Sequence, residues 1–221
     1  MNRVCDSRDS MRALKRFAVD AFASARYPDF VTLTMPRPSC VAAHDAFNVP
    51  VLFTIASMCA IGIAMPRALD LALVTRVFAL YVAADALWIF LFPRSVPRAA
   101  NVVVIHHLVT LALLSNAMRH PERAIETCRN GLVEWNTLFL ILRRAPGASR
   151  AWNVAYKLTL PIRFVWQPYL VIHFWRISRD DDAWERVVAI AAQVFLVAFN
   201  VFLVFGKKRR TNDGKEKNKA E

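Results

Sequence analysis

The chain lacks the cysteine spacings that build disulfide frameworks, zinc sites or redox motifs. Its four cysteines, Cys5, Cys40, Cys59 and Cys128, are far apart in the sequence. Two of them lie inside apolar segments. Metal and redox motifs place their cysteines a few residues apart, and small secreted domains pair theirs in regular patterns. The sequence therefore predicts no disulfide framework, which fits a membrane protein with cytosolic termini.

Two further absences limit the class of protein. No internal repeat is evident, which disfavours a transporter built from two inverted halves. No long apolar run precedes Asn48, so we expect no cleavable signal peptide. The acidic residues near the start, Asp6, Asp9 and Asp20, disfavour a transit peptide.

Acidic residues are scarce, with 17 Asp and Glu against 29 Lys and Arg, for a net charge of +12. A nucleic-acid ligand is disfavoured, because the basic residues lie mostly in the tails and between apolar blocks. The positive-inside rule places them there in membrane proteins. Basic tails also suit an anionic cytosolic membrane surface.

Long apolar blocks make up most of the remaining sequence. The chain is 56% hydrophobic with a mean hydropathy of +0.30. The blocks approach the length needed to cross about 30 Å of hydrocarbon. The sequence predicts an all-α, polytopic membrane helix bundle with about six spans over residues 48–206: Val49–Met65, Leu69–Phe92, Ala99–Met118, Ile125–Leu142, Asn153–Trp175 and Trp184–Phe205.

The two ends of the chain are polar. Residues 1–47 form an expected cytosolic segment, in which Met11–Ala25 is either an amphipathic surface helix or part of a disordered tail. Residues 207–221 form a basic cytosolic tail. With six spans, 19 Lys and Arg fall on the side of the termini and six on the other, which favours cytosolic termini. Prolines are expected to break structure up to the first span: Pro28, Pro36, Pro38 and Pro50.

One apolar block carries an adjacent histidine pair. His106 and His107 lie seven and eight residues after Ala99. At about 1.5 Å per residue, three other ionisable groups in neighbouring spans share their depth, about 10–15 Å from one membrane face. These groups are Asp85, Glu134 and Arg163. Lipid offers no partners to them, so we expect internal pairing.

This layer predicts a site with several possible roles. Asp85 or Glu134 could orient a histidine that acts as a base or nucleophile. Arg163 could instead bind an anionic lipid group. Adjacent residues point about 100° apart on a helix, so both histidines cannot face one spot. The alternative is a polar network that only holds the bundle together. No metal is expected, because an adjacent pair lacks the i,i+4 spacing of helical ligands.

Residues in four spans resemble the TLC domain of ceramide synthases, translocation-associated membrane proteins and ceroid-lipofuscinosis-type proteins. The resemblance covers roughly Asn48 to Phe205. It rests on these motifs: Tyr81-x-x-x-Asp85, His106-His107-Leu108-Val109-Thr110-Leu111, Glu134-x-x-Thr137-x-Phe139-x-x-x-Arg143, and Arg163 with Pro168-Tyr169.

The resemblance implies a helical bundle with a lipid-accommodating cavity. In the ceramide-synthase branch the histidine pair serves acyl transfer from acyl-CoA to a sphingoid amine, and His106 and His107 match it. That branch carries a histidine-aspartate pattern in the next helix, where this chain has Glu134 alone. Asn136 and Ile141 also replace an expected serine and asparagine. The chain therefore looks closer to the smaller TLC-domain proteins, linked to membrane lipid composition. No cofactor is expected, and acyl-CoA enters only as a substrate.

The tail ends in KNKAE, which resembles a dilysine retrieval signal read by a coat through Lys217 and Lys219. It predicts residence in the endoplasmic reticulum. Two functions remain open at this point: a lipid-handling protein, with or without acyltransferase activity, and a non-enzymatic trafficking or scaffold protein. A transporter is a weaker third.

Overall fold

Four apolar stretches of the chain become long helices. The computed structural model describes residues 37–96, 100–145 and 147–217. Within them every regular element is helical, which confirms the all-α prediction. The long helices are α2 (Arg37–Ala64), α3 (Leu71–Leu91), α4 (Ala100–Arg119) and α9 (Ala183–Lys217). Each contains a stretch long and apolar enough to cross a membrane.

The other two predicted spans are each divided. Residues 124–142 form α5 (Ala124–Gly131) and α6 (Val133–Leu142). Residues 150–177 form α7 (Arg150–Pro161), the π-helical segment η3 (Ile162–Trp166) and α8 (Gln167–Ile177). Pro161 has no N–H to donate to the preceding turn, and π-helical turns accommodate such interruptions. Neither segment is one continuous helix, and the count of six spans stays a prediction.

The expectation that prolines break the chain before the first span is wrong for Pro38 and Pro50. Helix α2 begins at Arg37 and runs through both. Pro38 occupies the first turn, where its missing N–H has no partner to lose. Pro50 lies mid-helix, which apolar membrane helices tolerate. The helix therefore begins well before Val49. The possible helix at 11–25 and the Lys219 signal lie outside the described residues.

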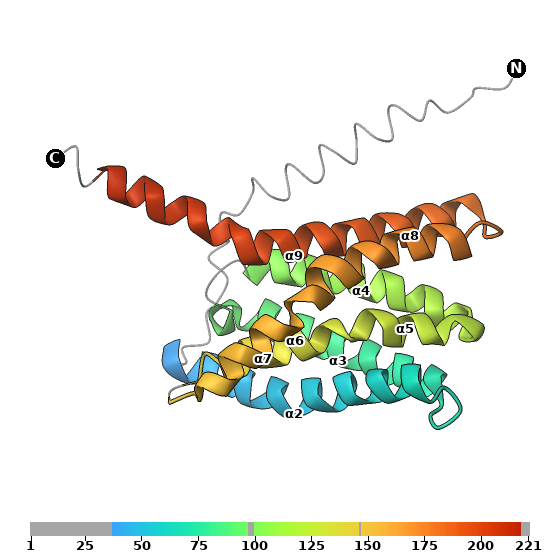
Figure 1. Ribbon diagram of the computed structural model, residues 1–221, viewed down its shortest axis with the longest axis horizontal. Helices are drawn as coiled ribbons and strands as arrows, with labels where there is room; N and C mark the ends of the chain where they lie inside the picture. Colours follow the sequence, from blue (N-terminus) through green and yellow to red (C-terminus); the bar gives the residue numbers. More distant parts are fainter. Residues whose placement is uncertain (1–36, 97–99, 146, 218–221) are drawn as a thin grey trace, which may run out of the picture.

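Short connections fall where prolines were expected to end spans. The 3₁₀ turns η1 (Pro93–Ser95) and η2 (Pro121–Arg123) each start with proline and join α3 to α4 and α4 to α5. Asp70 caps α3 by accepting hydrogen bonds from the backbone N–H groups of Ala72 and Leu73. The long elements consequently run antiparallel along one common axis (Figure 1).

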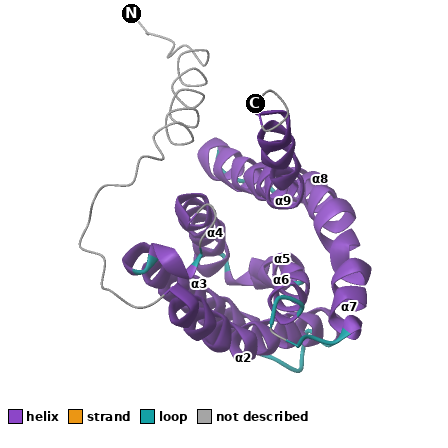
Figure 2. Ribbon diagram, turned by 90° about the vertical axis from the view of Figure 1, so that its left-hand side faces the viewer, coloured by secondary structure: helices purple, strands orange, loops and turns teal. Residues whose placement is uncertain are grey.

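The helices enclose a central pair. Figure 2 shows α2, α3 and α4 on one side, α7, α8 and α9 on the other, and α5 and α6 between them. Contacts between α6 and α7 and between α4 and α9 join the two sides. Two apolar clusters follow this division. One draws on α2, α3, α5 and α6 around Phe78, and the other on α4, α8 and α9 around Leu170.

Small residues let α2 and α5 approach closely. A Cβ at Gly131 would overlap the Cys59 Sγ, and one at Gly62 would come within 2.8 Å of the Cys128 Sγ. Both cysteines are fully buried and free. Close packing of this kind is typical of helices in membranes.

Large apolar side chains cover the outer surface. Leu80, Phe90 and Leu158 are each more than two-thirds exposed, and many others are partly so. Soluble monomers rarely expose so much contiguous apolar area. The apolar helices and this surface indicate an integral membrane protein.

Candidate functional site

A cavity of about 880 Å³ runs along the bundle interior. Asp45, Arg143 and Arg144 line one end of it, and Arg123 and Glu126 line the other. Glu126 and Arg143 bracket α5 and α6, so at ~1.5 Å per residue the cavity extends about 25 Å. Its middle is lined by His106, His107, Asp85 and Arg163. The structure thus brings four of the five predicted site residues to one cavity.

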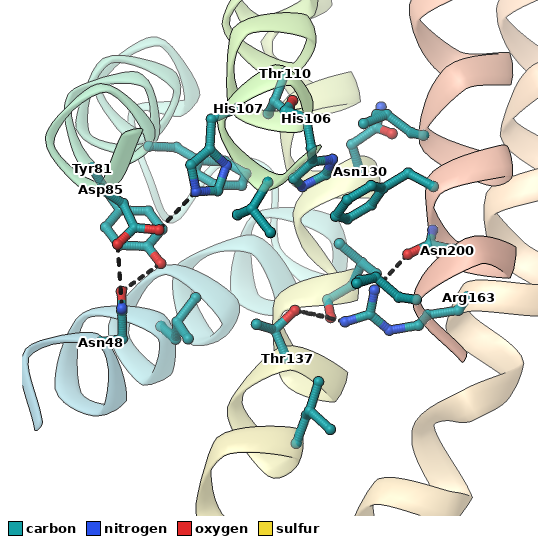
Figure 3. Close-up of a pocket in the computed structure, with 18 of the residues that line it drawn as sticks. Asn48, Tyr81, Asp85, His106, His107, Thr110, Asn130, Thr137, Arg163 and Asn200 are labelled. Carbon is teal, nitrogen blue, oxygen red and sulfur yellow. Dashed lines mark hydrogen bonds and ion pairs between the residues drawn. The ribbon is translucent and has the colours of Figure 1, made fainter. Parts of the chain in front are cut away.

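The first half of this centre is a network around Asp85. The Asp85 side chain is 4% exposed and receives a hydrogen bond from His107 Nε2 at 2.7 Å and from His44 Nε2 at 2.8 Å. Asn48 Nδ2 donates to the same carboxylate at 3.3 Å, and the Tyr81 hydroxyl donates to Asn48 at 2.7 Å (Figure 3). Because an ionised carboxylate only accepts, both histidines carry a proton on Nε2. Both oxygens of the Asp85 carboxylate therefore have donors.

Sequence reasoning missed His44 and Asn48. Both lie in α2 before the predicted first span, which was expected to begin at Val49. Their i,i+4 spacing was the available signal, since it places two polar side chains on one helical face. The Asp85 network thus extends to turns of α2 that precede the predicted start of the first span at Val49.

The two histidines point in different directions, as the helical geometry requires (Figure 3). His107 turns toward Asp85, and His106 stacks on Phe199 with ring centroids 4.0 Å apart. The buried Nδ1 of His106 has no hydrogen-bond partner among the described residues. An unpaired buried polar atom costs about 1–3 kcal/mol. His106 is therefore the histidine that lines the cavity with an unsatisfied ring nitrogen and without an acidic partner among the described residues.

The second half of the centre is Arg163, which is 5% exposed. It lies in η3, two residues after Pro161, the proline that interrupts the helix. Its Nε donates to Asn136 Oδ1 at 2.5 Å, Nη1 to Asn200 Oδ1 at 2.5 Å, and Nη2 to the Thr137 hydroxyl at 2.8 Å. All three acceptors are neutral. Among the described residues, no carboxylate oxygen comes within ion-pairing distance of this guanidinium.

Glu134 is the predicted site residue that does not line the cavity. It is half-buried on α6 and is not one of the described residues that line the cavity. Its carboxylate acts on Arg163 through space without forming an ion pair. The prediction that Glu134 orients a histidine finds no contact here, because Asp85 occupies that role for His107.

A separate polar cluster lies toward the Arg123 end of the cavity. Arg129 Nη1 donates to Glu126 Oε1 at 2.5 Å, an i,i+3 pair of the kind helical spacing favours. His173 Nε2 lies 2.9 Å from the other Glu126 oxygen. A further buried hydrogen bond runs from Gln193 Nε2 to Gln167 Oε1 at 2.9 Å. Within the described part of the chain, no group of three metal-ligating side chains is placed to hold an ion.

Comparison of the chain with models of known protein families, with curated proteins and with solved structures found no match.

Proposed function

We propose that this chain is a multi-pass membrane protein that binds a lipid or a fatty acyl chain in its central cavity. The observation that carries the proposal is a long cavity between apolar helices with His106 and His107 at its middle. One leaflet of a bilayer is about 15 Å of hydrocarbon, so about 25 Å of cavity can enclose an acyl chain. The likeness of the histidine and Asp85 motifs to the TLC domain supports the same class of ligand.

The two histidines have separate tasks in this proposal. His107 is oriented by Asp85, which fixes its tautomer and leaves Nδ1 as the basic nitrogen. His106 lies flat on Phe199 and is only partly buried in the cavity wall, so its ring borders the ligand. The functional centre then consists of one oriented histidine and one ligand-facing histidine.

The catalytic form of this proposal is acyl transfer. His107 Nδ1 takes a proton from the amine or hydroxyl of an acceptor, whose nitrogen or oxygen attacks the carbonyl of an acyl-CoA thioester. The carbon–sulfur bond breaks, and the departing thiolate receives the proton from His107. His106 hydrogen-bonds the acyl group meanwhile. Resemblance to ceramide synthases supports this step, and the single acid of the following helix, Glu134, separates this chain from them.

We also propose residence in the endoplasmic reticulum with both termini in the cytosol. The excess of basic residues on the side of the termini supports this orientation. A trafficking or scaffold function would need the tail but no chemistry at the histidines. Removing Lys217–Glu221 tests that alternative, because it should then relocalise the protein and abolish function.

The experiment compares lipid profiles in a cell that lacks the protein and is complemented with single and double alanine variants of His106 and His107. His120→Ala is the matched control, since His120 pairs with Glu185 away from the cavity. We expect wild type and the control to restore the profile and the double variant to fail. Full rescue by the double variant would remove the lipid-site and catalytic versions together.

A further inference from the structure

The Arg163 guanidinium has unused donors. An arginine side chain carries five N–H groups. Three of them are engaged, by Asn136, Asn200 and Thr137. One N–H on Nη1 and one on Nη2 have no acceptor among the described residues. These two terminal nitrogens form the fork that binds carboxylate or phosphate in bidentate fashion.

Among the described residues, the charge of Arg163 also has no directly bonded counterion. A buried cation is costly unless it is paired, because both its hydration and its counterion are lost. The other buried or half-buried cations show what pairing looks like here. Arg123 meets Asp181, and Arg129 meets Glu126. Arg163 is more buried than either and meets only neutral oxygens, which orient the guanidinium without neutralising it.

A second observation points to the same space. His106 lines the cavity with Arg163, and its buried Nδ1 lacks a partner. Figure 3 shows His106 descending from α4 and Arg163 entering from the opposite side, with Thr137 and Asn200 beside the guanidinium. Two polar residues therefore line one cavity, and each has a nitrogen whose hydrogen-bonding capacity is not filled by the described residues.

We propose that Arg163 binds the anionic headgroup, a carboxylate or a phosphate, of a single-chain amphiphile held in this cavity. The free N–H groups on Nη1 and Nη2 take two oxygens of the anion, and His106 contacts the same headgroup. The volume of about 880 Å³ falls in the usual range for small-ligand pockets, about 300–1,000 Å³, which favours one chain over a complete phospholipid. This inference rests on the proposed lipid-binding function and names the class of ligand.

The test measures binding of radiolabelled palmitate to the purified full-length protein in an uncharged detergent. Unlabelled palmitate, palmitoyl lysophosphatidate and hexadecanol compete for the site. These three probes share a sixteen-carbon chain and differ in headgroup, so carboxylate and phosphate are distinguished from each other and from a neutral group. We expect one or both anions to compete about 10- to 100-fold better than the alcohol, a difference of about 1.4–2.8 kcal/mol.

Two variants locate the preference. Arg163→Gln should weaken binding of the anion about 10-fold or more and leave hexadecanol unchanged. Asn200→Asp keeps the acceptor that Nη1 uses and gives Arg163 an internal carboxylate. It should displace the anionic probes to a similar extent while leaving the thermal stability of the protein equal or higher. Arg76→Gln is the matched control, since Arg76 is exposed on α3 and does not line the cavity.

The outcomes separate this inference from the proposed function. Equal binding of palmitate and hexadecanol would overturn the anion site and leave lipid binding in place. A preference for the anion that survives both Arg163→Gln and Asn200→Asp would place the headgroup elsewhere and also overturn it. Failure of every probe to bind wild type would overturn the lipid-binding function itself. If Arg163→Gln does not fold, Asn200→Asp decides alone.

Discussion

The two halves of the polar centre differ in how completely protein groups fill the hydrogen-bonding positions of a buried charged side chain. Asp85 lies between two histidines and an asparagine, and every oxygen of its carboxylate has a donor. Arg163 is as deeply buried, yet its three partners are neutral and two of its donors are unused. Both lie at the same depth and border the same cavity.

We call the Asp85 network closed, because both carboxylate oxygens accept from protein donors. We call the Arg163 network open, because two N–H groups of the guanidinium have no acceptor among the described residues. A carboxylate whose partners are all protein groups gains little from a ligand, and its network joins α2, α3 and α4. A guanidinium that is oriented but not neutralised gains a counterion when an anion arrives. We therefore assign structural and orienting work to the Asp85 half and ligand contact to the Arg163 half.

The largest expected effect on the free energy of unfolding comes from replacing the two buried charged residues, Asp85 and Arg163. Asp85→Ala leaves His44 and His107 without their acceptor, and each hydrogen bond to a charged group that is lost costs about 1.5–3 kcal/mol. Arg163→Gln should cost less, about 1–2 kcal/mol, because it loses hydrogen bonds but also removes an uncompensated charge. Unfolding titrations in a mixed detergent measure both free energies.

A control on the same helix calibrates these values. Asp70→Ala removes only the cap of α3, which typically costs about 1 kcal/mol. If Arg163→Gln proves as damaging as Asp85→Ala, Arg163 is a structural anchor equal to Asp85, and the division between closed and open halves fails.

The next effect separates the two adjacent histidines. His107→Ala removes the hydrogen bond that one oxygen of the Asp85 carboxylate accepts. A hydrogen bond to a charged group is worth about 1.5–3 kcal/mol. His106→Ala loses stacking on Phe199, worth about 0.5–1.5 kcal/mol. We therefore expect His107→Ala to lower the unfolding free energy more. His106→Ala should keep the fold and still lose ligand binding. The reverse order of stabilities would contradict the assignment of roles.

Much of this centre could be predicted from the order of residues. The depth argument placed Asp85, His106, His107 and Arg163 in one layer, and all four line the cavity. It failed for Glu134, because equal depth says nothing about which way a side chain turns around its helix. It also missed His44, because a proline in the following turn was read as the end of structure. In an apolar helix, a missing backbone hydrogen bond at Pro50 is not enough to end it.

The smallest effect concerns an arginine that does have a carboxylate partner, outside the spans. The hydrogen bond from Arg123 lowers the pKa of Asp181 from its ordinary value. A lowered pKa in the folded protein means that the stabilisation is present above the unfolded value, about 3.9, and is lost as pH falls through the folded value. Asp181→Asn should thus cost about 0.5–1 kcal/mol at neutral pH, as expected for a partly exposed pair.

The pH dependence of thermal unfolding checks this pair. The difference between wild type and Asp181→Asn should shrink as pH falls below the unfolded value of about 3.9 and disappear only below the lowered pKa of the folded protein. The neighbouring Asp180→Asn is the control and should match wild type at every pH, since Asp180 is exposed. A difference that persists at low pH would show that the Asp181 side chain acts by packing and not by charge.

The order of residues alone indicates a helical, apolar protein. It also predicts that a histidine pair, an aspartate and an arginine lie at one depth, and all four line one cavity. Rise per residue and hydropathy are local properties, and they suffice for that. The packing of the helices, in contrast, settles that Asp85 is shared by two histidines while Arg163 forms no ion pair with an acid among the described residues. The partners of a buried charged side chain depend on how whole helices rotate and approach each other. This rotation and approach are set by packing across α2, α4 and the interrupted helix at Pro161, and not by any one segment.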